Sequence, residues 1–200
     1  MKKILLLDKR SSRQKEALSN IGTEVEEFNQ IKGLFNLTGN VCKKHLLQLE
    51  EYNREILHEF ELFILHESDL SSIALKNITD YCSETEKSLI LFSGSIQQNL
   101  YINDGFNMLS VNSKSLYSEK IIEFTKKFIA SEISHLTELI YGNSWELNYA
   151  LIYRQLLLDE INGDELSNLN WKADLLESCI SILGKKNKES LDIFIDKKII

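Results

Sequence analysis

Four short apolar runs in this sequence each end at polar residues whose types are suited to chemistry. Asp8 and Lys9 follow the first run, His66 follows the second, and Ser93 and Asn112 follow the last two. An apolar run with an abrupt polar end is typical of a buried parallel strand, which delivers functional side chains at its carboxyl end. An aspartate there can bind a metal ion, and a histidine can act as an acid–base or be phosphorylated.

The elements that would position these residues alternate between strand and helix. Apolar runs predict strands at residues 2–7, 23–28, 60–65, 88–92 and 107–111. Helical spacing and capping residues predict helices at residues 13–21, 41–59, 73–82 and 119–132. This alternation predicts an α/β fold with a five-stranded, parallel, doubly wound sheet.

Three segments of the sequence have weaker patterns. Residues 23–28 alternate polar and apolar side chains, as expected for an edge strand. Residues 29–40 are expected to be irregular because Gly33 and Gly39 interrupt them. Residues 95–106 are expected to form a weak helix or a loop.

The strand signal stops near Ser134, while helical spacing continues to the end of the sequence. We therefore predict an α/β domain at residues 1–133 and an α-helical C-terminal module at residues 134–200. Large aromatic side chains in such a module more often belong to a core than to a ligand site. The candidates for an interface are Trp145, Tyr149, Tyr153 and Trp171.

Charge and hydropathy argue against several classes of protein. The chain has 30 acidic and 23 basic residues, a net charge of −7, which makes nucleic acid an unlikely partner. No apolar run approaches the roughly 18 residues that span a bilayer, so no membrane association is expected. The apolar run near the N-terminus is too short for a signal peptide, which predicts a cytoplasmic protein.

Cysteine and glycine patterns predict neither a metal nor a cofactor. Cys42, Cys82 and Cys179 are far apart and have no histidine or cysteine at zinc-ligand spacing, so free thiols are expected. The sequence contains neither a P-loop nor the glycine fingerprint of dinucleotide-binding folds.

The order of the strands and the residues at their ends resemble the receiver domains of bacterial two-component response regulators. The resemblance covers residues 1–133 and implies a flavodoxin/receiver-like sheet. In this comparison Asp8 matches the first of two acidic residues, but Lys9 replaces the second, metal-binding one. His66 stands in place of the phosphate-accepting aspartate, and Ser93 matches the hydroxyl position. Asn112 stands where a lysine is expected, unless the register shifts to Lys114.

The resemblance implies a pseudo-receiver that has lost phosphorelay chemistry. Phosphoryl transfer to a carboxylate requires Mg²⁺ held by oxygen ligands, and Lys9 and His66 remove that site. Three roles remain open for His66: phosphorylation or acid–base chemistry, a hydrogen bond to a neighbouring loop, or proximity to a salt bridge between Asp8 and Lys9 that replaces the metal.

Three hypotheses for function follow from the sequence. The first is a non-enzymatic regulatory or scaffold protein of signal transduction, with a protein partner or a homodimer contacting residues 95–132. The alternative is an atypical response-regulator-like transcription regulator that binds DNA through its helical tail. The third is an enzyme that uses His66 together with Ser93, for which the sequence suggests no substrate.

Overall fold

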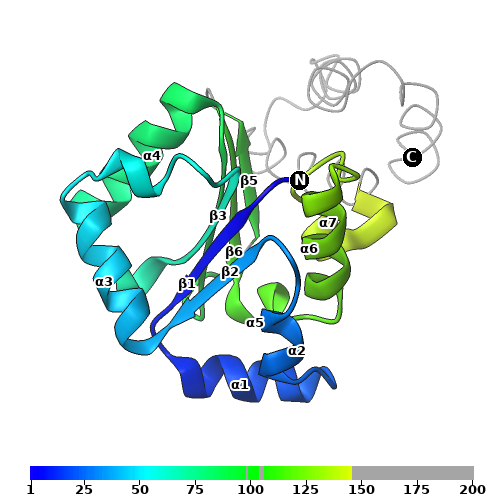
Figure 1. Ribbon diagram of the computed structural model, residues 1–200. Coiled ribbons are helices and arrows are strands. Elements are labelled where there is room, and N and C mark those ends of the chain that lie inside the picture. Colours follow the sequence, from blue (N-terminus) through cyan, green and yellow to red (C-terminus); the bar gives the residue numbers. More distant parts are fainter. Residues whose placement is uncertain (98, 104–105, 146–200) are drawn as a thin grey trace, which may run out of the picture. The chain divides into compact units, whose positions relative to one another are not determined.

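The computed structural model describes residues 1–97, 99–103 and 106–145, which form a six-stranded sheet flanked by helices (Figure 1). The strands are β1 (Ile4–Asp8), β2 (Leu34–Thr38), β3 (Leu62–His66), β4 (Ser88–Ser93), β5 (Leu100–Asn103) and β6 (Asn107–Asn112). Their order is β2-β1-β3-β4-β6-β5, and every neighbouring pair is parallel except β5 and β6. The predicted α/β fold is therefore confirmed, although the sheet is mostly parallel rather than wholly parallel.

The five parallel strands follow the order of flavodoxin-like folds, in which the chain first turns to one side of β1 and then to the other. Strand β5 departs from the predicted five-stranded sheet. It lies within residues 95–106, where we expected a weak helix or loop, and pairs antiparallel with β6. Its register places Leu100 opposite Ser110 and Ile102 opposite Met108, so hairpin hydrogen bonds stabilise the segment.

The edge strand next to β1 lies later in the sequence than predicted. Residues 23–28 are not a strand, since helix α2 (Val25–Asn29) covers most of them. Glu26 and Glu27 lie in the first turn of α2, where acidic side chains stabilise a helix, and Phe28 is fully buried. The edge strand is β2, within the segment expected to be irregular. Six alternating residues were too few to distinguish a strand from a short helix.

The longer helices lie where they were predicted, but one of them is shorter than predicted. They are α1 (Ser11–Asn20), α3 (Gly39–Glu50), α4 (Ser72–Thr85) and α6 (Lys120–Ala130), with shorter α5 (Ser113–Leu116) and α7 (Glu138–Tyr141). The helix expected at residues 41–59 ends at Glu50. Tyr52 adopts a positive φ of 53°, and the Asn53 side chain then caps a separate 3-10 turn by accepting a hydrogen bond from the Glu55 backbone amide.

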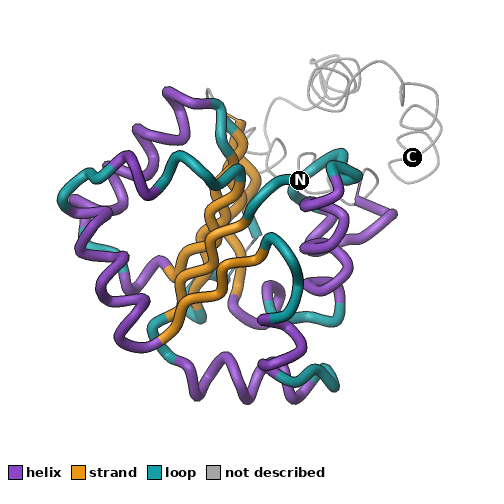
Figure 2. Tube along the Cα trace, viewed as in Figure 1, coloured by secondary structure: helices purple, strands orange, loops and turns teal. Residues whose placement is uncertain are grey.

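Helices cover both faces of the sheet, as Figures 1 and 2 show. Helices α3 and α4 pack on one face, and α1, α2, α5, α6 and α7 pack on the other. Alternate residues of each strand point to opposite faces. In β1, for example, Leu5 and Leu7 contact the α3/α4 core, whereas Ile4 and Leu6 belong to the core beneath α1 and α6.

The chain divides into two units after Gly142. Leu136 and Leu139, which follow the predicted boundary at residue 133, belong to the core of the first unit. In the second unit the structure describes residues 143–145, and Trp145 is buried. The predicted helical module beyond that point, with Tyr149, Tyr153 and Trp171, lies outside the described residues. Within the described ranges, no helix is long and apolar enough to cross a membrane.

Candidate functional site

Asp8 and His66 meet at the carboxyl edge of the sheet. Leu7 of β1 lies opposite Leu65 of β3. Asp8 and His66, the next and last residues of these two strands, are therefore neighbours. Both side chains follow the alternation toward the face covered by α1 and α5. Asp8 is fully buried, and His66 is 2% exposed. The sequence therefore predicted correctly that these two residues lie at neighbouring strand ends.

The cation that joins these two residues is Arg13, from the first turns of α1. Its guanidinium donates a hydrogen bond of 2.7 Å to Oδ1 of Asp8, and another of its nitrogens lies 3.0 Å from Nε2 of His66. Lys9, which we considered as the partner of Asp8, is exposed and contributes its backbone amide to Asp69 instead. Helix α1 lies on the same face as Asp8, so Arg13 reaches both residues.

The contact with Arg13 determines the tautomer of His66. Because a guanidinium only donates hydrogen bonds, Nε2 of His66 accepts one and the ring proton lies on Nδ1. Nδ1 is 3.0 Å from Oδ2 of Asp69, an ion-pair distance without hydrogen-bond geometry. Burial, and then the charge of Arg13, lower the pKa of His66, so its ring is neutral at pH 7.

A second layer of polar side chains holds Asp8 from the side of α5. The Tyr117 hydroxyl donates a hydrogen bond of 2.8 Å to Oδ2 of Asp8 and accepts one of 3.0 Å from Gln14. Gln14 and Asn36 exchange two amide hydrogen bonds of 2.8 and 2.9 Å. Burial, and then the negative charge of Asp8, raise the pKa of Tyr117 well above its ordinary value. Tyr117 therefore acts as a neutral hydrogen-bond donor.

Ser93 and Asn112 form a separate group at the ends of β4 and β6, where they are paired in register. The Ser93 hydroxyl is 3.0 Å from that of Ser68 and 2.9 Å from that of Ser95. Among the described residues, no hydrogen bond links Ser93 to His66. The Ser93 hydroxyl thus has serine partners rather than the His66 partner considered for an enzyme.

Asn112 and Lys114, the two residues considered for the lysine position, have different environments. The Asn112 side chain donates a hydrogen bond of 2.7 Å to the backbone oxygen of Ile96 and accepts one of 2.9 Å from the backbone amide of Lys114. It thus caps α5. Lys114 is exposed.

Asp8, His66 and Asp69 also form a possible metal-ligand cluster, since one ligand atom from each lies within 4.8 Å of the others. Both carboxylate oxygens of Asp8 are already used by protein donors, however. Oδ1 of Asp8 accepts hydrogen bonds from Arg13 and from the backbone amide of Arg10, and Oδ2 accepts from Tyr117. The guanidinium supplies the positive charge that a metal ion would bring.

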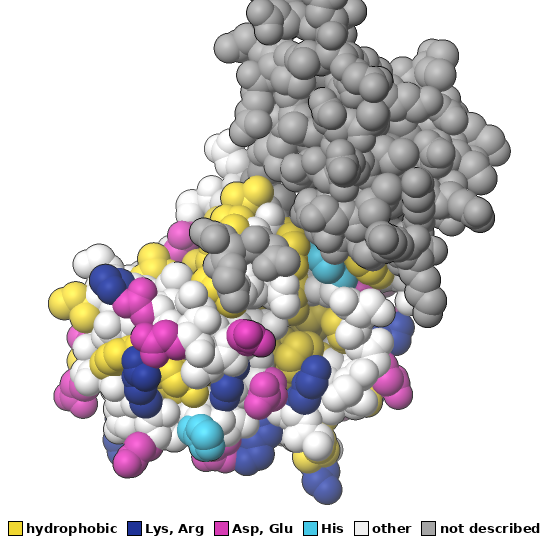
Figure 3. Space-filling view, turned by 90° about the horizontal axis from the view of Figure 1, so that it is seen from above, with side chains coloured by type: hydrophobic (Ala, Val, Ile, Leu, Met, Phe, Trp, Pro, Cys, Tyr) yellow, Lys and Arg dark blue, Asp and Glu magenta, His cyan; other side chains and the backbone are white. Residues whose placement is uncertain are grey.

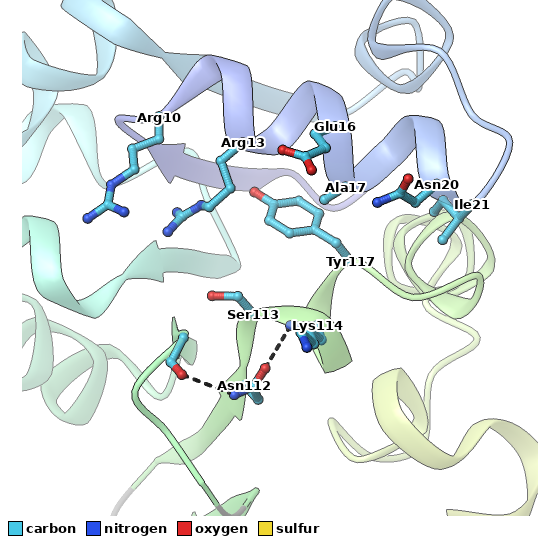
Figure 4. A pocket seen from close by; sticks show the side chains of 11 residues that line it. Arg10, Arg13, Glu16, Ala17, Asn20, Ile21, Asn112, Ser113, Lys114 and Tyr117 are labelled. Atoms are coloured by element: carbon cyan, nitrogen blue, oxygen red, sulfur yellow. Dashed lines mark hydrogen bonds between the residues drawn. The ribbon is translucent and has the colours of Figure 1, made fainter.

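A cavity of about 700 Å³ opens beside this network, between α1 and the N-terminal end of α5 (Figure 4). Its wall includes side chains of both helices and the ends of β4 and β6. The lining residues are Arg10, Arg13, Glu16, Ala17, Asn20, Ile21, Gly94, Asn112, Ser113, Lys114 and Tyr117.

Comparison of the chain with protein-family models, with curated proteins and with solved structures gives no significant match. The receiver resemblance therefore stays a prediction based on strand order and strand-end residues.

Sequence reasoning missed Arg13, Asp69 and Tyr117. Arg13 carried a usable signal, because a cation in the first turns of a helix that directly follows β1 lies close to the end of that strand. Tyr117 lies 109 residues from Asp8, and only the folded chain brings the two together.

Proposed function

We propose that this protein is a non-enzymatic regulatory or scaffold module that acts through protein–protein contacts and does not accept phosphate. The observation that carries the proposal is the ion pair of Arg13 with buried Asp8, which lies against His66 at the sheet edge. In the receiver domains that this chain resembles, the same edge would hold Mg²⁺ and an aspartate that takes the phosphoryl group.

Two features of this edge oppose phosphoryl transfer. The end of β3 carries an imidazole in place of a carboxylate, and its Nε2 is already in contact with Arg13. The fixed guanidinium neutralises Asp8 without a metal, whereas transfer from a phosphate donor needs a cation that bridges donor and acceptor oxygens. The edge is thus suited to hold one conformation, which favours a constant binding surface over a switch.

Surface features support protein contacts as the mode of action. Strand β5 is an edge strand, because it is the last in the order of the sheet. Its Leu100 is 38% exposed. This strand lies within residues 95–132, the segment that we predict to contact a partner. Basic and acidic side chains are interspersed on the face drawn in Figure 3. Such a mixture suits a protein partner better than the uniformly basic surface that nucleic acid requires.

Phosphorylation chemistry can be tested directly. We expect intact-mass measurement to find no phosphoryl adduct after incubation with acetyl phosphate and Mg²⁺. The variant Lys9→Asp/His66→Asp, which restores the carboxylates of a receiver, is the matched comparison. A stoichiometric adduct on the unaltered protein would contradict the proposal.

The contact function needs a second experiment. Affinity purification from the native host is expected to recover a specific protein partner, or light scattering to detect a dimer. A strict monomer without any co-purifying protein would argue against the proposed mode of action.

A further inference from the structure

The cavity between α1 and α5 has a wall rich in positive charge. Three cations line it, Arg10, Arg13 and Lys114, against the single carboxylate of Glu16. Asp8 neutralises Arg13, so Arg10 and Lys114 against Glu16 leave a local charge of +1, in a chain whose net charge is −7. A concentration of positive charge at one cavity of an acidic protein favours an anionic ligand.

Two of these cations are available to a ligand. Arg13 is paired with Asp8. Arg10 and Lys114 are both exposed, and neither side chain forms an ion pair with any residue in the part of the chain that the structure describes. Arg10 directly precedes α1 and Lys114 lies in α5, on the two sides of the cavity (Figure 4). A guanidinium and an ammonium on opposite walls can hold an anion between them.

Unsatisfied donors lie in the same wall. The Ser113 hydroxyl and Nε of Arg13 are buried and have no hydrogen-bond partner among the described residues. A hydroxyl can rotate toward an acceptor, and a phosphate offers several acceptor oxygens. The Ser113 hydroxyl is a second feature, independent of net charge, that favours an oxyanion.

The remainder of the wall is less polar and lies along α1. Ala17 and Ile21 provide apolar surface, with the Asn20 amide beside them, and Figure 4 places these residues at the other end of the cavity from Arg10. The volume of about 700 Å³ lies within the usual range for small-molecule sites. The cavity can therefore hold an organic body in addition to an anionic group.

We propose that this cavity reversibly binds a small organic phosphate monoester. Its dianionic phosphate lies between Arg10 and Lys114, and its organic body lies along Ala17 and Ile21. A dianionic phosphate brings one charge for each of the two available cations, whereas a carboxylate brings a single charge. Binding is non-covalent, so the site is separate from the phosphoacceptor chemistry that the β3 end has lost. Arg13 belongs to both the cavity and the Asp8 network, so an occupied cavity alters the surroundings of His66.

Calorimetric titration of the full chain with two matched pairs of probes tests this site. The pairs are AMP with adenosine, and glucose 6-phosphate with glucose, and glucuronate serves as the carboxylate probe. We expect a phosphate monoester to bind and its uncharged partner not to bind. Arg10→Gln and Lys114→Gln should each weaken binding about tenfold, because each removes a charge-assisted hydrogen bond.

Lys15→Gln is the matched control, since Lys15 is exposed on α1 but does not line the cavity. Its affinity should stay within about twofold of the unaltered protein. In NMR spectra of the histidine side chains, the phosphate monoester should shift the His66 signals and leave those of exposed His58 unchanged. Any of three results would overturn the proposal. Neither phosphate binds, Lys15→Gln loses as much affinity as Arg10→Gln and Lys114→Gln, or glucuronate binds as tightly as the phosphates. None of these outcomes bears on the absence of a covalent phosphoryl adduct.

Discussion

The two faces of the sheet are built from alternate residues of the same strands but differ in chemistry. The α3/α4 face is an apolar core that includes two free thiols, Cys42 and Cys82, and burial raises the pKa of each to about 12. The face under α1 and α5 buries Asp8 and His66 with their polar partners. The α3/α4 face is packed with apolar side chains, while the α1/α5 face combines apolar packing with a buried polar network.

The polar network places a charged side chain in the protein interior, where burial costs free energy. Burying a carboxylate is unfavourable unless it is paired and hydrogen-bonded, and Asp8 has an ion pair and two further hydrogen bonds. Replacing such a network by apolar side chains often maintains or increases stability. Its presence at the carboxyl edge, beside the cavity, therefore favours a role in binding or in fixing one conformation.

Among changes to the polar network, removal of the Arg13 guanidinium should cause the largest loss of folding stability. Arg13→Met leaves the Asp8 carboxylate buried without its cation, and loss of one partner from a buried pair costs about 3–5 kcal/mol. Because the Arg13 side chain is 26% exposed, we expect about 3 kcal/mol. Urea denaturation at pH 7.5 measures the loss.

The double variant Asp8→Asn/Arg13→Met distinguishes an unpaired charge from lost packing. We expect it to recover most of the stability, since it removes both charges and keeps the shape of the Asp8 side chain. If the double variant is no more stable than Arg13→Met, the ion pair is not what stabilises this edge.

Acidification should destabilise the protein through two histidines, His66 on the polar face and His135 in the loop between α6 and α7. Burial lowers the pKa of His66, and burial also lowers the pKa of His135 to about 4. A histidine with a lowered folded pKa is protonated first in the unfolded chain, so stability is lost as pH falls below about 6.5. At pH 5, His135 alone accounts for about 2 kcal/mol, and His66 adds to the loss in the same direction.

Urea denaturation at pH 7.5 and 5.0 measures this dependence. His66→Gln and His135→Gln should each reduce it. On the other face, Ile78→Ala should cost about 2–5 kcal/mol through a cavity, by the same amount at both pH values, because Ile78 is fully buried among apolar side chains. Equal pH dependence in all three variants would show that neither histidine is responsible.

Periodicity and strand-end chemistry predicted four of the five parallel strands, β1, β3, β4 and β6, and the meeting of Asp8 with His66, because both follow from local patterns. The errors arose where a pattern was short or a partner was distant. Residues 23–28 have too few positions to separate a strand from helix α2, and β5 depends on its pairing with β6. Lys9 is adjacent to Asp8 in sequence, but the docking of α1 brings Arg13 to the carboxylate instead.

The smallest of these effects should come from Tyr117→Phe, which removes one hydroxyl and leaves the aromatic ring in place. The hydroxyl donates to the charged Asp8 carboxylate, and loss of such a bond costs about 1.5 kcal/mol when other donors remain. Tyr81→Phe on the α3/α4 face is the matched change. Tyr81 is also buried, but its hydroxyl has no hydrogen bond to a residue within the described ranges, so we expect less than about 0.5 kcal/mol. Equal losses in the two variants would mean that the Tyr117 hydroxyl adds nothing specific to the network.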